Sequence, residues 1–183
     1  MSVTVITATM PGREHLLAEA MASVAAQTYR PLDHLIAVDY VQRGGARPKN
    51  LLAETVETDW IATLDDDDIL YPQHLDLLIA ASEDADVVYS WCDVTGDDPW
   101  EQYNRSFDAD LLRRLSIVSH NAMVRTELVA EVGGWDEARG YDWTFWHKCL
   151  DAGARFRCVP ERTWLYRLDA GWRHESRPWL AAS

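Results

Sequence analysis

Two hydrophobic patterns alternate along this chain of 183 residues. Short apolar, β-branched runs are typical of buried strands, and they predict strands or extended segments at residues 2–8, 34–39, 60–64, 86–91, 117–125, 155–159 and 163–167. Apolar residues three or four positions apart are typical of helices, which we expect at residues 13–27, 50–57, 72–82, 108–115, 126–132 and 141–152. A strand, a helix and another strand open the chain, which favours parallel strands with right-handed crossovers. The pattern predicts an α/β fold, a mainly parallel twisted sheet flanked by helices.

Acidic residues stand where the predicted strands end. Asp39 ends the second strand, and a run of four aspartates, residues 65–68, follows the apolar strand at 60–64. In open α/β sheets, ligands bind at the carboxyl ends of the strands. Adjacent carboxylates raise one another's pKa, so we expect such a run either in solvent or around a cation.

Carboxylate oxygens are hard ligands, and the aspartate run therefore suits Mg²⁺ or Mn²⁺, which proteins hold with one or two carboxylates and the substrate's phosphates. An acidic surface turn, or a helix N-terminus where Asp interacts favourably with the macrodipole, would explain the same residues without a metal. A calcium loop of the EF-hand type is not supported, because the run lacks the alternating spacing and the glycine of that motif.

Composition narrows the class of protein. A chain of 183 residues is long enough for one domain with a substantial core. The net charge of -13 weighs against nucleic acid or an anionic membrane as a partner, since phosphate backbones are bound by Lys and Arg patches. Three cysteines without metal-ligand spacing fit reduced thiols and a cytoplasmic location. We find no signal peptide and no apolar run of membrane-spanning length.

Several motifs occur in a characteristic order and spacing. They lie at residues 3–9, 23–31, 36–39, 64–68, 131–137, 142–146, 159–161 and 165–167. Together they resemble a compact, bacterial or phage-like glycosyltransferase of the family 2 type, with the GT-A fold. The resemblance implies a single domain over residues 1–183, with a nucleotide-sugar half at about 1–95 and an acceptor half at about 96–183. It implies transfer of a sugar from a nucleoside-diphosphate sugar, with UDP or GDP expected, to a hydroxyl acceptor.

The resemblance also implies a donor site in the first half of the chain. Its expected contacts with the nucleotide sugar are Thr7, Thr9, Asp39, Arg47, Lys49, Asp65 and Asp66. Lys49 stands where the family usually carries arginine, because Asn50 precedes Asp65 by the usual 15 positions. A lysine there offers the diphosphate a point charge rather than a planar fork. Arg47 could substitute for it, and both could instead be solvated loop charges.

A Mn²⁺ or Mg²⁺ ion is implied as the cofactor, since an ion bridging both phosphates stabilises the charge that gathers on the leaving group. The implied ligands are Asp67, Asp65 and His174. Asp67 is the expected direct ligand, whereas Asp66 and Asp68 are expected behind it or in solvent. His174 lies in a segment that resembles the one closing over the donor in this family, and a surface histidine is the alternative.

On the acceptor side, the resemblance implies that Asp142 is the general base that takes the proton of the attacking hydroxyl. A single in-line displacement would invert the anomeric configuration. A helix N-terminal Asp stabilised by the macrodipole is the structural alternative. Tyr141 and Thr144 replace acidic residues of the family pattern, which leaves the acceptor contacts open. His120 is expected to be a core histidine.

Two functions other than sugar transfer are compatible with an α/β fold of this kind. A nucleotidyltransferase would carry a Gly-rich loop after the first strand, and residues 9–13 contain a single glycine. A degenerate module could bind a nucleotide sugar or a glycan without turnover, and the departures at Lys49 and Tyr141 keep that function open. A chain this short implies a shallow acceptor pocket, or one completed by a homo-oligomer or a large substrate.

Overall fold

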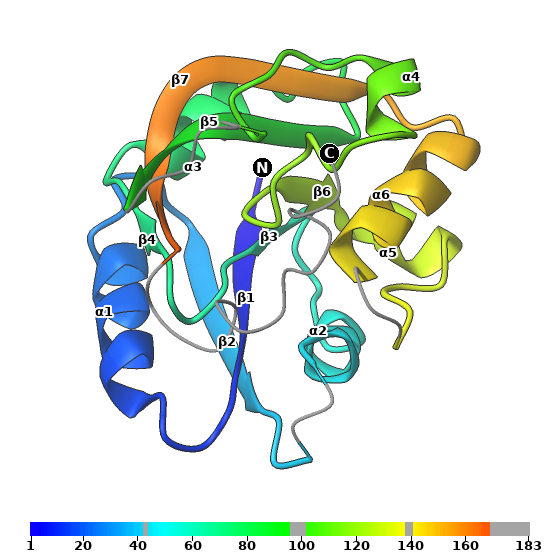
Figure 1. Ribbon diagram of the computed structural model, residues 1–183. Coiled ribbons are helices and arrows are strands. Elements are labelled where there is room, and N and C mark those ends of the chain that lie inside the picture. Colours follow the sequence, from blue (N-terminus) through cyan, green and yellow to red (C-terminus); the bar gives the residue numbers. More distant parts are fainter. Residues whose placement is uncertain (42–43, 96–101, 138–140, 169–183) are drawn as a thin grey trace, which may run out of the picture.

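The structure is a computed structural model that describes residues 1–41, 44–95, 102–137 and 141–168. Its strands are β1 (Val3–Thr9), β2 (Leu32–Val38), β3 (Trp60–Thr63), β4 (Ile69–Leu70), β5 (Val87–Thr95), β6 (Met123–Arg125) and β7 (Phe156–Arg167). Its helices are α1 (Glu14–Ala25), α2 (Ala46–Ala53), α3 (His74–Ala80), α4 (Ala109–Leu112), α5 (Thr126–Glu131) and α6 (Tyr141–Asp151). A curled sheet forms the centre of the molecule, with helices on both sides (Figure 1).

The described strands form one sheet in the order β2-β1-β3-β6-β5-β7-β4. Strand β1 runs parallel to both β2 and β3, and β5 runs parallel to β7. Strand β6 lies antiparallel between β3 and β5 and joins these two parallel groups. The parallel register brings the carboxyl ends of β1, β2 and β3 to one edge of the sheet, so the predicted mainly parallel α/β fold is confirmed.

Both faces of the sheet are buried, which explains the continuous apolar character of its strands. Side chains alternate between the faces. Val5 and Ala62 therefore pack on the side of α1 and α3, while their neighbours Ile6 and Ile61 pack on the side of α2, α5 and α6. Four tryptophans are fully buried in these two cores, namely Trp60, Trp135, Trp146 and Trp164. The high tryptophan content therefore serves packing to a large extent.

The predicted boundaries are wrong at prolines and in one polar segment. Helix α2 begins at Ala46 rather than residue 50, because Pro48 lies in the first turn, where its missing N–H has no intrahelical partner to lose. The two extended segments predicted at 155–159 and 163–167 form one strand, β7, and a register shift against β5 accommodates Pro160. The two-residue strand β4 was not predicted.

The strand predicted at residues 117–125 exists only as β6. Residues 119–122 instead bond to the end of β3 through single groups: Thr63 N–H donates to Ala122 O, and Asp65 N–H donates to Asn121 Oδ1 at 3.1 Å. This segment therefore does not continue the strand ladder. Its polar groups lie beside the aspartate run at the end of β3, at the acidic edge of the sheet.

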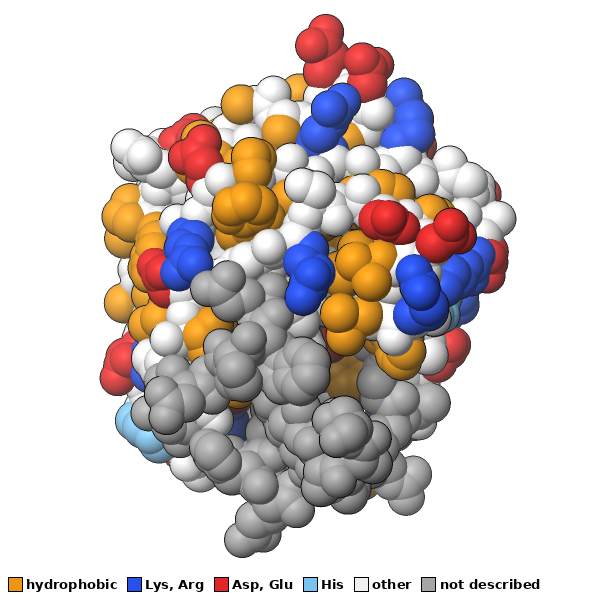
Figure 2. Space-filling model, turned by 45° about the horizontal axis from the view of Figure 1, so that its top comes forward, with side chains coloured by type: hydrophobic (Ala, Val, Ile, Leu, Met, Phe, Trp, Pro, Cys, Tyr) orange, Lys and Arg blue, Asp and Glu red, His pale blue; other side chains and the backbone are white. Residues whose placement is uncertain are grey.

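Figure 2 shows one face of the molecule, on which basic side chains are interspersed with acidic and hydrophobic ones. Proteins that bind nucleic acid gather Lys and Arg into a patch or stripe. The face shown therefore adds no support for a nucleic acid partner.

The buried His74 is expected to make the folded state sensitive to acid. Its Nδ1 lies 2.6 Å from Thr163 Oγ1, and burial lowers the pKa of His74 to about 3. The unfolded chain binds this proton near pH 6.5. His74 therefore does not lower the free energy of unfolding above pH 6.5. As the pH falls from 6.5 towards 3, the unfolded chain takes up the proton and the free energy of unfolding decreases, by at most about 1.4 kcal/mol per pH unit. Urea unfolding of the wild type and His74→Asn between pH 7 and 5 checks this. Equal pH slopes for the two proteins would contradict the prediction.

Candidate active site

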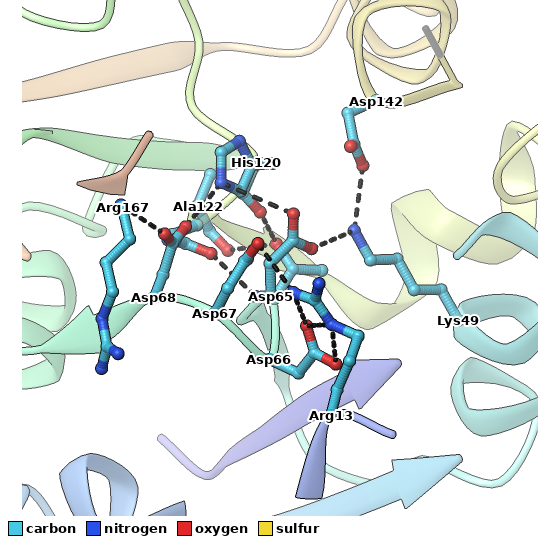
Figure 3. A network of polar contacts seen from close by, with 12 residues as sticks. Arg13, Lys49, Asp65, Asp66, Asp67, Asp68, His120, Ala122, Asp142 and Arg167 are labelled. Atoms are coloured by element: carbon cyan, nitrogen blue, oxygen red, sulfur yellow. Dashed lines mark hydrogen bonds and ion pairs between the residues drawn. The ribbon is translucent and has the colours of Figure 1, made fainter. Parts of the chain in front are cut away.

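The four aspartates after β3 are buried rather than solvated. Asp65, Asp66, Asp67 and Asp68 expose 8%, 6%, 5% and 0% of their surface. A buried carboxylate requires a cation or hydrogen-bond donors. Figure 3 shows that the side chains supplying them converge from several parts of the chain.

Arg13, which follows β1, neutralises the middle of the acidic run. Its guanidinium forms a two-pronged contact with Asp66, with Nε at 2.9 Å from Oδ2 and Nη2 at 2.8 Å from Oδ1. The same Nη2 lies 2.8 Å from Asp67 Oδ2, and Thr9 Oγ1 donates to Asp66 Oδ2 at 2.6 Å. The predicted donor residues Thr9 and Asp66 are thus brought together. Sequence reasoning missed Arg13, whose only signal was its place after the first strand.

Asp68 is held in a fixed internal network and does not reach solvent. Its Oδ2 lies 2.7 Å from His120 Nε2 and accepts from Asn121 Nδ2 at 2.8 Å, while its Oδ1 accepts from the Arg167 backbone N–H at 3.1 Å. The His120 ring contacts the aromatic rings of Tyr103, Trp164 and Tyr166 with centroids at 5.6, 5.4 and 5.4 Å. His120 is buried, as predicted, but it is also part of the acidic site.

These groups could hold a divalent ion. Asp65, Asp68 and His120 offer ligand atoms that all lie within 4.8 Å of one another. Carboxylates suit both Mg²⁺ and Mn²⁺, and an imidazole nitrogen favours the transition metal. Asp67, the predicted direct ligand, lies in the same loop against Arg13. The other predicted ligand, His174, lies outside the described residues.

Lys49 connects the acidic run to the predicted general base. Its side chain is fully buried, and its Nζ lies 3.1 Å from both Asp65 Oδ1 and Asp142 Oδ1. The ring of Tyr141 covers the ammonium, with its centroid 5.1 Å from Nζ. Burial lowers the pKa of Lys49, but Asp142 and Asp65 outweigh it and raise that pKa well above its usual range. Lys49 therefore stays charged.

Asp142 lies in the first turn of α6 and faces the acidic run across Lys49 (Figure 3). Burial raises the pKa of Asp142 and the charge of Asp65 adds to this rise, although Lys49 opposes it. A carboxylate with a raised pKa is a stronger base when it is ionised. Its position and basicity suit it to take a proton from a hydroxyl group.

The other predicted donor residues lie further from this network. Thr7 is buried on β1, where its Oγ1 lies 2.9 Å from His34 Nε2. Asp39 follows β2 and accepts from the backbone N–H groups of Val41 and Gly44 at 3.0 and 3.1 Å. Arg47 is exposed on α2. Asp39 is connected to the aspartate run through Thr9, because its backbone N–H donates to Thr9 O at 2.7 Å and Thr9 Oγ1 donates to Asp66.

A second link to α2 comes from Asn50. Its Oδ1 accepts from the Trp135 backbone N–H at 2.8 Å, and its Nδ2 donates to Trp135 O at 2.7 Å. The two bonds fix the backbone of Trp135, which lies before α6. Asn50 is half-buried and Trp135 is buried. Gly134, with φ +65°, passes so close that a Cβ there would lie 2.3 Å from Asn50 Oδ1.

Gly134→Ala is therefore expected to destabilise the fold by about 2–5 kcal/mol, through backbone strain of roughly 1–2 kcal/mol and damage to the Asn50 hydrogen bonds. Gly133→Ala is a matched control, because Gly133 has φ +73° but no atom within 4 Å of its added Cβ. Urea unfolding should show the Gly134 variant to be less stable than the Gly133 variant by at least about 1 kcal/mol. Equal losses would mean that only backbone strain matters.

The sheet order, the acidic loop after β3 and the facing carboxylate on α6 define the GT-A class of glycosyltransferase folds. The model of the family described as "Glycosyl transferase family 2" matches residues 40–142, which is more than half of the chain, and the chain belongs to this family. The matched segment contains the aspartate run and ends at Asp142. The family resemblance inferred from the motifs is confirmed.

Solved structures of S. aureus TarS share the fold. The structure in complex with UDP-GlcNAc superposes with a TM-score of 0.76 at 16% sequence identity, covering 97% of this chain and 61% of that chain. The complex with UDP gives 0.73 at 15% identity, covering 92% and 61%, and the longer TarS structure gives 0.75 at 16%, covering 92% and 37%. This chain thus spans less than two thirds of the length of these TarS chains, between 37% and 61%.

A search of curated proteins finds no match. Among the helices of the described residues, none combines the length and the apolar character that crossing a membrane requires.

Proposed function

We propose that this chain transfers a sugar from a nucleoside-diphosphate sugar to a hydroxyl acceptor, using a divalent metal ion and inverting the anomeric configuration. One observation carries the proposal: in a chain of this family, the Asp142 carboxylate faces the buried aspartate run across Lys49, with 3.1 Å from Nζ to each side. A donor bound at the acidic edge would present its anomeric carbon towards a base on α6.

We assign the donor half to residues 1–95 and the acceptor half to residues 96–183. Thr7, Thr9 and Asp39 lie on or after the strands that end at the acidic edge, which supports their assignment to the nucleotide side. UDP is the first nucleotide to test, because TarS, with the same fold, was solved with UDP and with UDP-GlcNAc. GDP is the second.

Asp65 and Asp67 are the proposed metal ligands, with Asp68 and His120 behind them. Asp68 already accepts from two N–H groups and lies 2.7 Å from His120 Nε2, so its network is suited to hold the loop in place. A bound Mn²⁺ or Mg²⁺ would act as a Lewis acid on the diphosphate leaving group. Arg13, which lies against Asp66 and Asp67, supplies a positive charge at the same edge.

Asp142 would accept the proton of the acceptor hydroxyl as that oxygen attacks the anomeric carbon. Among the described residues, only Lys49 bonds to this carboxylate, through Oδ1. The second oxygen, Oδ2, is thus left to the acceptor. Attack opposite to the leaving diphosphate inverts the configuration.

A thermal-shift panel tests the donor site. UDP, GDP and dTDP, each with Mn²⁺ or with EDTA, would be added to the wild type and to Asp67→Asn. A nucleotide at about 100 times its Kd should add about 2.7 kcal/mol of stability. The expected result is a Mn²⁺-dependent shift with one nucleotide that Asp67→Asn lacks. A folded protein that responds to no nucleotide would contradict the donor site.

A module that binds a nucleotide sugar without turnover is the second candidate. Tyr141 favours it, because its ring covers Lys49 at the position where the family pattern has an acidic residue. Nucleotide binding without release of UDP from UDP-GlcNAc, with or without candidate acceptors, would select this function.

A further inference from the structure

Helix α2 contacts the acceptor side of the site through two adjacent residues. Lys49 reaches Asp142 at the start of α6, and Asn50 holds both backbone groups of Trp135. The two residues of the first contact are 93 positions apart along the chain, and those of the second are 85 positions apart. One turn of a short helix therefore holds both the Asp142 carboxylate and the backbone of Trp135.

The surroundings of Lys49 are those of a structural cation. Its side chain is 0% exposed, and its ammonium is surrounded by the Asp65 and Asp142 carboxylates and the Tyr141 ring. The Tyr141 hydroxyl in turn packs against Gly45, where a Cβ would lie 2.6 Å from the hydroxyl oxygen. Tyr141 therefore contacts both Gly45, at the start of α2, and the Lys49 ammonium.

A buried ion pair that loses one partner leaves an uncompensated charge, which is strongly unfavourable. If Lys49 moved from Asp142 to a diphosphate, the buried Asp142 carboxylate would lose the cation that it pairs with in the structure. Because Lys49 also contacts Asp65, it sets the distance between the donor edge of the sheet and the base on α6. A shift of 1 Å in such a distance can cost a hundredfold in rate.

We propose that Lys49 and Asn50 act as a two-point clamp that positions the Asp142 carboxylate relative to Asp65, so that Lys49 is a positioning residue rather than a ligand of the diphosphate. The catalytic part of this inference rests on the proposed function, since it requires Asp142 to act as the base. The structural part, coupling of Lys49 to Asp142, does not.

The test compares Lys49→Met, Lys49→Arg and Asn50→Ala with the wild type. Lys148→Met is a matched control, because Lys148 forms a partly exposed pair with Asp136 at 2.9 Å on the helix that carries Asp142. Calorimetry measures the Kd of UDP with Mn²⁺, and an assay of UDP release measures the kcat of UDP-GlcNAc turnover, with water or a candidate hydroxyl compound as the acceptor of the sugar. Urea unfolding of Lys49→Met, Asp142→Asn and the double variant measures the coupling of the two side chains.

The clamp predicts that kcat falls at least 100-fold in Lys49→Met and at least 10-fold in Asn50→Ala, while the Kd of UDP changes less than threefold. Lys49→Arg should recover kcat to within tenfold of the wild type, because it restores the cation. Lys148→Met should change neither quantity. A Kd of UDP that rises tenfold or more, with kcat retained at saturation, would overturn the proposal and make Lys49 a diphosphate ligand.

The unfolding cycle separates this proposal from the proposed function. If the wild type binds none of UDP, GDP and dTDP and turns over none of their sugars, the proposed function fails, and the unfolding cycle alone tests the coupling. Coupling of at least tenfold in the unfolding equilibrium constant, about 1.4 kcal/mol, supports the clamp, and coupling below twofold overturns it. If Lys49→Met does not fold, the same cycle with Asn50→Ala and Asp142→Asn, and the kinetics of Lys49→Arg, give the decision.

Discussion

Asp142→Asn is expected to lower the kcat of sugar transfer by about 10²–10⁴-fold, the usual contribution of a general base, while the Kd of UDP stays within a few fold. The amide has the shape of the carboxylate and can still accept from Lys49, but it cannot take a proton. Steady-state kinetics and calorimetry on the purified variant check the two quantities separately.

Asp151→Asn is the matched control for this variant, because Asp151 lies on the same helix, is 63% exposed in its side chain and pairs only with Arg113 at the surface among the described residues. Its kcat should equal that of the wild type. Full turnover in Asp142→Asn would remove Asp142 from the reaction and redirect the search for a base.

The pKa of Asp142 also predicts how turnover depends on pH. Burial, together with the charge of Asp65, raises the pKa of Asp142 despite the opposing effect of Lys49. A base must be ionised, so kcat should fall as the pH decreases through this raised pKa, at a higher pH than for an ordinary aspartate near 3.9. A pH profile of kcat for the wild type, flat down to pH 4, would contradict this.

Loss of the metal ligands is the second large effect that we expect. Asp65→Asn and Asp67→Asn should each weaken Mn²⁺ binding by more than about 100-fold, whereas His120→Gln, which removes a group behind a ligand, should cost roughly 10–100-fold. Chelation by EDTA should abolish turnover and Mn²⁺ should restore it. Calorimetric titration of Mn²⁺ in the presence of UDP measures the three affinities.

The order of the losses decides between two donor sets. If His120→Gln and Asp68→Asn cost more than Asp67→Asn, the ion is held by the group of Asp65, Asp68 and His120, whose ligand atoms lie within 4.8 Å of one another. Asp151→Asn, far along α6, should leave Mn²⁺ affinity unchanged and again serves as the control.

The main features of the fold could be predicted from the sequence because they depend on local patterns. The alternation of β-branched runs with helical periodicity located β1, α1, β2 and β3, and the aspartate run stood directly after β3. The strand predicted at 117–125 was too long, because the apolar residues 117–118 and 123–124 enclose residues 119–122, which bond to the end of β3 through individual polar groups instead of forming a ladder. Periodicity does not distinguish such a buried segment from a ladder.

The partners of the carboxylates could not be predicted, because they depend on tertiary structure. Arg13 and Asp66 are 53 residues apart, and His120 and Asp68 are 52 apart. A single sequence gives no signal for such pairs. Lys49 was expected to contact the diphosphate, with a solvated loop charge as the alternative, and nothing in the sequence signalled its burial between Asp65 and Asp142.

The position of β6 also bears on how this chain folds during synthesis. Residues 123–125 fill the gap between β3 and β5, so a chain that has emerged only to residue 95 carries two open strand edges next to the apolar Ile61 and Val87. Open edges of this kind promote pairing with other chains. We therefore expect residues 1–95 not to fold stably alone. Because β5 and β4 also pair with β7, a nascent chain should stay vulnerable to aggregation until both β6 and β7 have left the ribosome.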